Sequence, residues 1–172
     1  MTNDIRELDR EAAAAHLPAL IDLLADAVAS GASVGFLAPL DPGEAEAYWR
    51  GVLARLGDDL VLLAAFDGGR PVGSVQLELV GKANGRHRAE IAKLLVHRDA
   101  RRRGLGAALM AAAVEAARAR GRSLLVLDTR TGDAAERLYL RLGWTKAGTI
   151  PNFARSSDGP LAATSLFYLE LA

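Results

Sequence analysis

The stretch that decides the fold is residues 88–116, RAEIAKLLVHRDARRRGLGAALMAAAVEA. Its first third is apolar, its middle carries three consecutive arginines and two glycines, and its last third has helical spacing. A helix start has backbone N–H groups without intrahelical partners and a partial positive charge, so it attracts anions. Gly104 and Gly106 lack the Cβ atoms that would keep a phosphate away from these groups. This order predicts a strand, an anion-binding turn and a helix, with pyrophosphate as a fitting ligand.

The glycine pattern of this turn discriminates between phosphate ligands. The chain contains no G-x-x-x-x-G-K-[ST] sequence, which excludes the nucleoside-triphosphate loop. The dinucleotide pattern G-x-G-x-x-G/A would need Gly or Ala at Leu109, and its acidic partner would fall in the wrong type of element. The pattern that fits is R-x-x-G-x-G at residues 101–106, which resembles the acetyl-CoA pyrophosphate loop of the GNAT superfamily of N-acetyltransferases.

A second segment supports the same resemblance. Residues 138–144, LYLRLGW, look like the L-Y-x-x-x-G-[FW] segment of the superfamily, and they follow the glycine loop by one helix and one strand, as they do there. The superfamily resemblance covers roughly residues 60–172. Three shorter strings resemble the tabtoxin-resistance acetyltransferase group within it: HRAE at 87–90, LDT at 127–129 and SDGP at 157–160.

Composition sets the outer limits. A length of 172 residues predicts one domain spanning 1–172. The net charge is zero, which argues against a nucleic-acid binder, and cysteine is absent, which excludes disulfides and a thiol nucleophile. No apolar run reaches the ~18 residues that would span a bilayer. We expect a cytoplasmic protein without membrane or nucleic-acid partners, either a monomer or a homodimer.

Periodicity and turn signals predict an α/β (α+β) chain of strands and helices, and the resemblance implies that they form a GNAT fold. We expect a mixed, mostly antiparallel sheet of about seven strands with a central parallel strand–helix–strand crossover and four flanking helices. Asp67-Gly68-Gly69-Arg70 predicts a hairpin, and Asp41 with Pro42 predicts a helix start. The predicted strands are 4–8, 60–66, 71–80, 86–97, 123–128, 144–150 and 163–171, and the predicted helices are 9–28, 42–56, 105–120 and 134–142.

Three residues are candidates for acid–base chemistry. Transfer of acetyl from a thioester to an amine requires that the amine lose a proton and that the leaving thiolate gain one. By resemblance, Tyr139 is the acid, and Glu90 and Asp128 face the acceptor amine as bases. Each has an ordinary alternative: Tyr139 as a packing aromatic, Glu90 as the solvated face of a strand, and Asp128 as a cap for the following turn. His16, His87 and His97 show no metal-ligand spacing, so no metal is expected.

The resemblance also assigns the coenzyme contacts. The backbone of Leu95, Val96 and His97 should pair with the pantetheine amides as an added strand would. The backbone from Arg101 to Ala107 should hold the pyrophosphate, although some of the three arginines could simply be solvated. Many relatives carry Asn where this chain has Gly132, which puts a side-chain contact there in doubt. The predicted coenzyme-binding residues are Leu95, Val96, His97, Arg101, Arg102, Arg103, Gly104, Leu105, Gly106, Ala107 and Ala135.

Acceptor contacts are predicted less directly. Ser33 and Phe36 lie between the first two predicted long helices, a region that borders the acceptor pocket in GNAT enzymes, and Asn152 lies in a polar loop expected at 151–161. Phe36 could equally be a core residue. The resulting hypothesis is an acetyl-CoA-dependent N-acetyltransferase that acylates the primary amine of a small molecule, such as an amino acid-like toxin or antibiotic. A non-catalytic acyl-CoA-binding regulatory domain and a protein or peptide N-acetyltransferase remain open alternatives.

Overall fold

A mixed sheet forms the centre of the computed structural model, which describes residues 4–171. The predicted GNAT-type architecture is confirmed: the strand order is β1-β2-β3-β4-β5-β7-β6, and only the β4–β5 pair is parallel. Residues 1–3 and 172, which fall within the predicted domain, lie outside the described part. The strands are β1 (Asp4–Leu8), β2 (Leu60–Asp67), β3 (Arg70–Leu79), β4 (Arg88–Val96), β5 (Leu124–Arg130), β6 (Thr145–Arg155) and β7 (Leu161–Glu170).

The first predicted helix is divided in two. His16 caps the end of α1 with non-helical backbone angles, and Pro18 follows in the first turn of α2, where its missing N–H is tolerated. The described residues therefore contain five α-helices instead of the four predicted. They are α1 (Arg10–Ala15), α2 (Leu17–Ala29), α3 (Pro42–Arg55), α4 (Leu105–Ala119) and α5 (Ala134–Arg141). Within this part of the chain, no helix is both long and apolar enough to cross a membrane.

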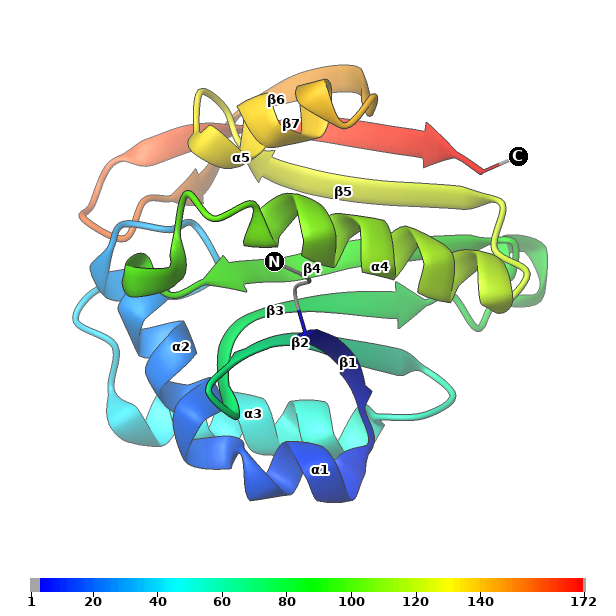
Figure 1. Cartoon of the computed structure of the whole chain (residues 1–172). Coiled ribbons are helices and arrows are strands. Elements are labelled where there is room, and N and C mark those ends of the chain that lie inside the picture. The colour runs from blue at the N-terminus through cyan, green and yellow to red at the C-terminus, as the bar shows by residue number, and fades with distance from the viewer. Residues whose placement is uncertain (1–3, 172) are drawn as a thin grey trace.

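Helices cover both faces of the sheet, as Figure 1 shows. Alternate residues of β2 point to opposite layers: Leu60 and Leu62 pack with α2 and α3, whereas Val61 and Leu63 pack with α4. Trp49 of α3 is fully buried in the first layer. A strand buried on both sides needs apolar residues throughout, which is why β2 reads LVLLAAF without alternation.

The parallel strands β4 and β5 separate after a short paired segment. Pairing covers only Arg88–Glu90 against Leu124–Val126, so beyond these residues the facing edges of the two strands make no hydrogen-bonded ladder. A bulge in the β3–β4 pairing accompanies the separation, and Lys93 within it has a left-handed φ of 51°. The bulge reverses the alternation, so that Ile91 packs with α4 but Leu95 packs with α2 and α3. The result is an opening between β4 and β5.

Three local predictions are wrong. The expected loop at 151–161 is mostly strand, because β6 continues through Pro151 to Arg155 with bulges, and only residues 156–160 form the turn. The inward face of α5 holds Glu136 and Tyr139, whereas Leu142 is exposed. In α4 the buried stripe is shifted by one residue from the predicted one, toward Met110, Ala113 and Ala117, and Ala108 and Ala112 are only half-buried.

Candidate functional site

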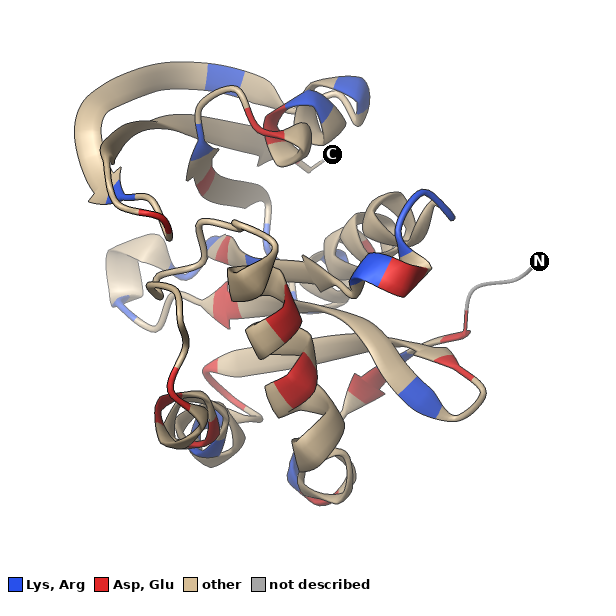
Figure 2. Ribbon diagram, turned by 90° about the vertical axis from the view of Figure 1, so that its left-hand side faces the viewer, with Lys and Arg blue, Asp and Glu red and all other residues tan. Residues whose placement is uncertain are grey.

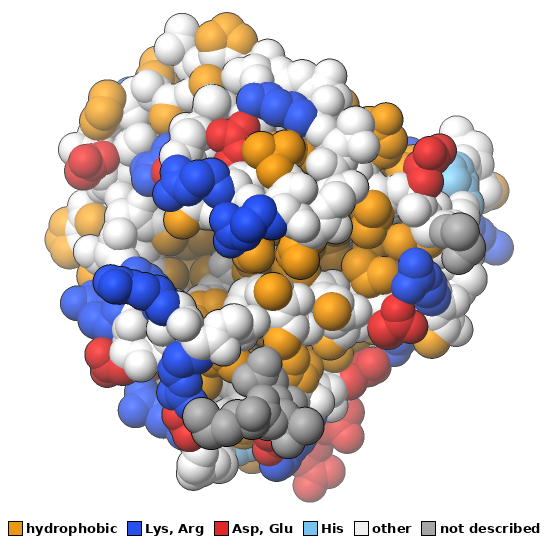
Figure 3. All heavy atoms as spheres, turned by 45° about the horizontal axis from the view of Figure 1, so that its top comes forward, with side chains coloured by type: hydrophobic (Ala, Val, Ile, Leu, Met, Phe, Trp, Pro, Cys, Tyr) orange, Lys and Arg blue, Asp and Glu red, His pale blue; other side chains and the backbone are white. Residues whose placement is uncertain are grey.

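The basic turn before α4 borders a large cavity of about 740 Å³ between α4, α5 and the free edge of β4. Figure 2 shows basic residues gathered in this turn, and Figure 3 shows a hollow with an apolar floor and basic side chains at its rim. Its lining includes Leu94, Leu95 and Val96 from β4. Leu95 and Val96 pair with β3 on one side, and β5 has already diverged on the other. An extended ligand could therefore add to this edge as a strand does.

The turn presents the start of α4 to this cavity. Gly104 is the N-cap, with φ of 78°, and no side chain caps the first N–H groups of the helix. Left-handed backbone at this point favours glycine. Gly106 serves a different purpose, since a Cβ atom there would lie 3.2 Å from a Leu138 methyl carbon where α4 approaches α5. The helix thus begins where the sequence predicted, and no side chain caps its first N–H groups.

The three arginines of the turn have different partners. Arg101 donates from Nε to the Val96 carbonyl at 3.0 Å and lies 3.5 Å from the Asp26 carboxylate, so it fastens the turn to β4 and α2. Arg103 pairs with Asp67 at 2.7 Å, in the β2–β3 hairpin. Arg102 lines the cavity and forms no ion pair with any other described residue. Of the three arginines in the turn, Arg102 is therefore the one whose charge is uncommitted and available to a phosphate.

The carboxylate of Asp26 organises this attachment. Burial alone would raise its pKa, but hydrogen bonds from the backbone and side chain of Arg98, together with the nearby His97, lower it below the usual value. A carboxylate that accepts several hydrogen bonds in a buried place stays ionised. Asp26 thus binds Arg98 and Arg101, which lie on the two sides of the basic turn. Nothing in the sequence around Asp26 indicated this role.

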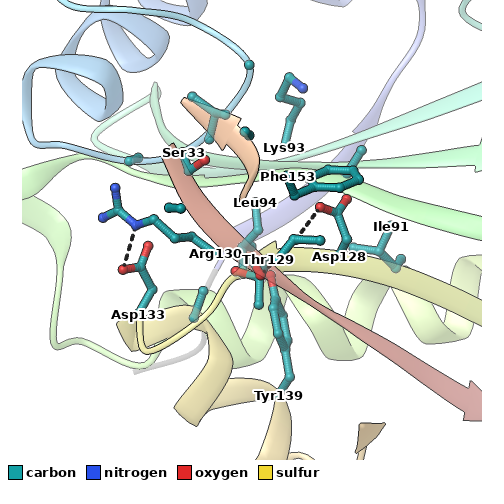
Figure 4. Close-up of a pocket in the computed structure, with 18 of the residues that line it drawn as sticks. Ser33, Ile91, Lys93, Leu94, Asp128, Thr129, Arg130, Asp133, Tyr139 and Phe153 are labelled. Atoms are coloured by element: carbon teal, nitrogen blue, oxygen red, sulfur yellow. Dashed lines mark hydrogen bonds and ion pairs between the residues drawn. The ribbon is translucent and has the colours of Figure 1, made fainter. Parts of the chain in front are cut away.

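A second cavity of about 380 Å³ adjoins the first. The two share five lining residues, so they adjoin at the opening between β4 and β5. Figure 4 shows this second cavity with side chains from β4, β5, α5 and the α2–α3 loop pointing into it. The shared residues are Ala32, Leu94, Arg130, Asp133 and Ala135.

Carboxylates gather along one side of the second cavity. Glu90 lies opposite Glu78 in the β3–β4 register, and Asp128 extends from β5 two residues beyond the partner of Glu90. The Thr164 hydroxyl donates to Asp128 at 2.7 Å. Loss of water around the Glu90 carboxyl raises its pKa, and the negative charges of Glu78 and Asp128 raise it further. A carboxylate with a raised pKa is a better proton acceptor than an ordinary one.

Tyr139 approaches the same cavity from α5. Its ring is buried between Trp144 and Phe167, with centroid separations of 6.1 and 6.0 Å, and its hydroxyl end reaches the cavity lining (Figure 4). Burial, and then the charge of Asp128, raises the pKa of Tyr139 to about 12. The hydroxyl therefore remains protonated at neutral pH and can act only as a proton donor at the start of a reaction.

A buried carboxylate that the sequence gave no reason to notice holds α5 in place. Glu136 accepts hydrogen bonds from the backbone N–H of Gly132, the Ser165 hydroxyl at 2.8 Å and the Lys146 ammonium at 2.9 Å. Chiefly because of the Lys146 hydrogen bond, and then that of Gly132, the pKa of Glu136 falls to about 2. These bonds join the turn after β5 to β6 and β7, and so fix the helix that carries Tyr139.

Most of the residues predicted for the site line the two cavities. Ser33, Glu90, Asp128 and Tyr139 line the smaller one, Ala135 lines both, and eight further coenzyme candidates line the larger one: Leu95, Val96, Arg101, Arg102, Gly104, Leu105, Gly106 and Ala107.

Four predicted residues lie outside both linings: His97, Arg103, Phe36 and Asn152. The His97 backbone is already used, because its N–H bonds to the Val72 carbonyl at 2.9 Å and its carbonyl accepts from Ala100 at 2.9 Å. Phe36 packs edge-to-face on Tyr48. This agrees with the alternative interpretation from the sequence, in which Phe36 is a core residue.

Several lining residues were missed by sequence reasoning, among them Lys93, Glu78 and Phe153. Glu78 could have been found, since it lies on the polar face of an alternating strand that pairs with the strand of Glu90. Lys93 gave no usable signal, because strict alternation would have placed it with Ile91 toward α4, and only the bulge changes this. Phe153 was assigned to a loop that is a strand.

Comparison with known proteins agrees with this geometry. Residues 23–144 match the model of the acetyltransferase (GNAT) family. The chain belongs to this family. An L-methionine sulfoximine/L-methionine sulfone acetyltransferase of Pseudomonas paraeruginosa is 30% identical over 143 residues, which cover 83% of this chain and 82% of the relative. A protein of the same description occurs in Pseudomonas aeruginosa at the same identity. This GNAT chain is therefore an acetyltransferase by family.

Solved structures show the same GNAT fold. The ribosomal-protein-alanine N-acetyltransferase of Brucella melitensis has a TM-score of 0.79 at 24% identity, with 97% of this chain and 99% of that one covered. A phosphinothricin acetyltransferase of Sinorhizobium meliloti, solved in complex with AcCoA, has a TM-score of 0.80 at 17% identity, with 100% and 90% covered.

Proposed function

We propose that this chain, acting as one GNAT domain, transfers the acetyl group of acetyl-CoA directly to the primary amine of a small molecule. The observation that carries the proposal is the pair of adjoining cavities at the opening between β4 and β5. The larger cavity offers an open helix start and a free strand edge, and the smaller one offers two carboxylates and a buried tyrosine. A phosphorylated thioester and an amine would enter these two cavities and meet at their shared lining.

The residues of the larger cavity fit the coenzyme. The N–H groups at the start of α4 and the Arg102 guanidinium match the negative charge of a pyrophosphate, and the left-handed Gly104 leaves the approach open because nothing lies within 4 Å of its missing Cβ. Leu95 and Val96 lie on the edge that β5 has left, where the Val96 carbonyl already accepts from Arg101. We assign them to the pantetheine amides.

The chemistry then follows from the three candidate residues. Glu90 or Asp128 first takes one proton from the acceptor ammonium, directly or through water, which frees the lone pair of the nitrogen. The nitrogen then bonds to the thioester carbonyl carbon and loses its second proton to water. The carbon–sulfur bond breaks, and the Tyr139 hydroxyl donates its proton to the departing sulfur. With a pKa of about 12, the resulting phenolate then regains a proton from solvent. The chain has no cysteine, so no acyl-cysteine intermediate forms.

The acceptor class is supported by charge and by likeness. Two carboxylates suit an ammonium group, and a cavity of about 380 Å³ suits a small molecule. The relative from P. paraeruginosa is named for L-methionine sulfoximine and L-methionine sulfone, which are small primary amines, and one structural neighbour is named for phosphinothricin. We propose an acceptor of this kind, and with it a role in resistance to such compounds.

Thiol release from acetyl-CoA with a panel of small amines, protein N-terminal peptides and lysine peptides would test the proposal. We expect turnover with small amines. Tyr139→Phe should lower kcat by a factor of about 10² or more, because general acids contribute about 10²–10⁴, with little change in coenzyme affinity. Tyr168→Phe, on β7 outside both cavities, is the matched control. Tight coenzyme binding without turnover on any amine would instead indicate a regulatory domain.

A further inference from the structure

Lys93 occupies an unusual backbone position in the acceptor cavity. It is one of three non-glycine residues with positive φ in the described chain, and it lies in the bulge where β4 leaves β5. Left-handed backbone is disfavoured for a lysine, and such strain gathers at functional sites. The bulge turns this side chain away from the α4 layer and into the cavity (Figure 4).

Aromatic and loop contacts hold the ammonium group of Lys93. Its Nζ lies 5.7 Å from the centroid of the Tyr48 ring, and 3.7 Å from the point where a Cβ of Gly35 would be. Tyr48 is itself fixed by hydrogen bonds with Gln76, of 2.8 and 3.1 Å. The ammonium thus lies beside α3 and the α2–α3 loop, next to an aromatic ring and a glycine that carry no formal charge.

The other charges around the cavity divide into paired and unpaired groups. Arg130 pairs with Asp133 at 3.0 Å, and Glu78 pairs with Arg55 at 3.0 Å. Among residues 4–171, Lys93 has no carboxylate within ion-pairing distance. The uncommitted charges are therefore the carboxylates of Glu90 and Asp128 and the ammonium of Lys93.

We propose that Lys93 binds a carboxylate group of the acceptor, and that the acceptor is a small molecule carrying both an ammonium and a carboxylate, as α-amino acids do. This inference rests on the proposed function and narrows it. The acceptor ammonium faces Glu90 and Asp128 while its carboxylate faces Lys93. Burial lowers the pKa of Lys93, and the charges of Glu78, Asp128 and Glu90 oppose this. A bound carboxylate would favour the charged lysine further.

The test compares the common L-α-amino acids with their carboxamides, because the members of each pair differ only in the carboxylate. For the wild type we expect kcat/KM to favour the acid over its amide. In Lys93→Met this preference should fall about tenfold or more, or ~1.4 kcal/mol, with the amide rate changed less than about threefold. Methionine has similar length and the same backbone cost at positive φ. Lys93→Arg should keep part of the preference.

Two controls separate the possible failures. Lys82→Met, at an exposed site outside both cavities, should behave as wild type. Coenzyme affinity and thermal unfolding establish that the Lys93 variants are folded. If Lys93→Met slows acid and amide equally, or if the wild type favours the amide, Lys93 is only a counter-charge for the acidic pair and the inference is overturned.

A calorimetric titration keeps the inference testable without turnover. Wild type saturated with CoA should bind the amino acid more tightly than its amide, and Lys93→Met should remove this difference. If the proposed function is wrong, the wild type will turn over no amine. If only the role of Lys93 is wrong, the wild type will bind or acetylate the amino acid and its amide equally well.

Discussion

Glu136→Gln tests whether a buried charge holds α5 and Tyr139 in place. The substitution keeps the size of the side chain and removes the charge that accepts hydrogen bonds from Gly132, Ser165 and Lys146. The pKa of Glu136 falls from 4.5 to about 2 on folding, which corresponds to about 3 kcal/mol at ~1.4 kcal/mol per unit. We expect a loss of about 2–3 kcal/mol in the free energy of unfolding at pH 7, since glutamine still accepts one hydrogen bond.

The lowered pKa of Glu136 also predicts how the stability of the protein changes with pH. Because the folded pKa lies below the unfolded one, the stabilisation by Glu136 is fully present above about pH 5 and is lost as the pH falls toward 2. By pH 3 the wild type should have lost about 2 kcal/mol of this contribution. The difference between the wild type and Glu136→Gln should therefore shrink by that amount between pH 7 and pH 3.

Urea unfolding at the two pH values measures both quantities. Glu46→Gln is the matched control, because Glu46 forms an exposed pair with Arg50 at 2.6 Å, and such pairs are worth about 0.5 kcal/mol or less. A destabilisation by Glu136→Gln that is equally large at pH 3 and pH 7 would refute the electrostatic explanation. An effect no larger than that of Glu46→Gln would show that the network does not hold α5.

Two further predictions concern the acceptor cavity and the coenzyme cavity. Glu78→Gln removes one of the charges that raise the pKa of Glu90. The acid limb of the pH profile of kcat/KM should therefore move to lower pH, but it should stay above that of an ordinary carboxyl because the burial of Glu90 persists. An acid limb that does not move would mean that Glu90 is not the group that titrates. Gly104→Ala should cost about 1–2 kcal/mol of stability, because an L-residue is disfavoured at φ of 78°, and should also weaken coenzyme binding. Gly121 has a φ of 66° and follows the C-terminal end of α4, so Gly121→Ala should cost similar stability and leave coenzyme affinity unchanged. Equal coenzyme affinities in the two variants would contradict the assignment of the Gly104 turn to the pyrophosphate.

Local sequence signals predicted the turns and helix starts well, because neighbouring residues determine the backbone conformation at these points. The Asp67 to Arg70 turn forms the expected hairpin, and the Asp41 side chain accepts from Gly43 and Glu44 as an N-cap should. Gly104 occupies the left-handed N-cap of α4. In each case residues within four positions of one another determine the backbone, so the sequence alone contains the information.

The helix division and the course of β6 show where this reasoning ends. His16 and Pro18 lie inside an otherwise helical pattern, and the pattern alone did not indicate that the helix would break there. β6 continues past Pro151 because Ala154 and Arg155 pair with Ala162 and Leu161 of β7 across the turn at 156–160. The turn propensity of Pro151 and Asn152 therefore appears as a bulge within β6, where Asn152 has a φ of 53°.

The sequence by itself determined the strand–turn–helix unit, the family and 13 of the residues that line the two cavities, because the glycine and arginine spacing and the LYLRLGW segment are contiguous strings with a local physical meaning. Only the tertiary structure decided which charges are free to act. Asp26 and Asp67 take up Arg101 and Arg103 from distant segments, and a bulge redirects Lys93 into the acceptor cavity. Ion pairs and strand register depend on which segments meet in space, and that is settled only when the whole sheet has formed.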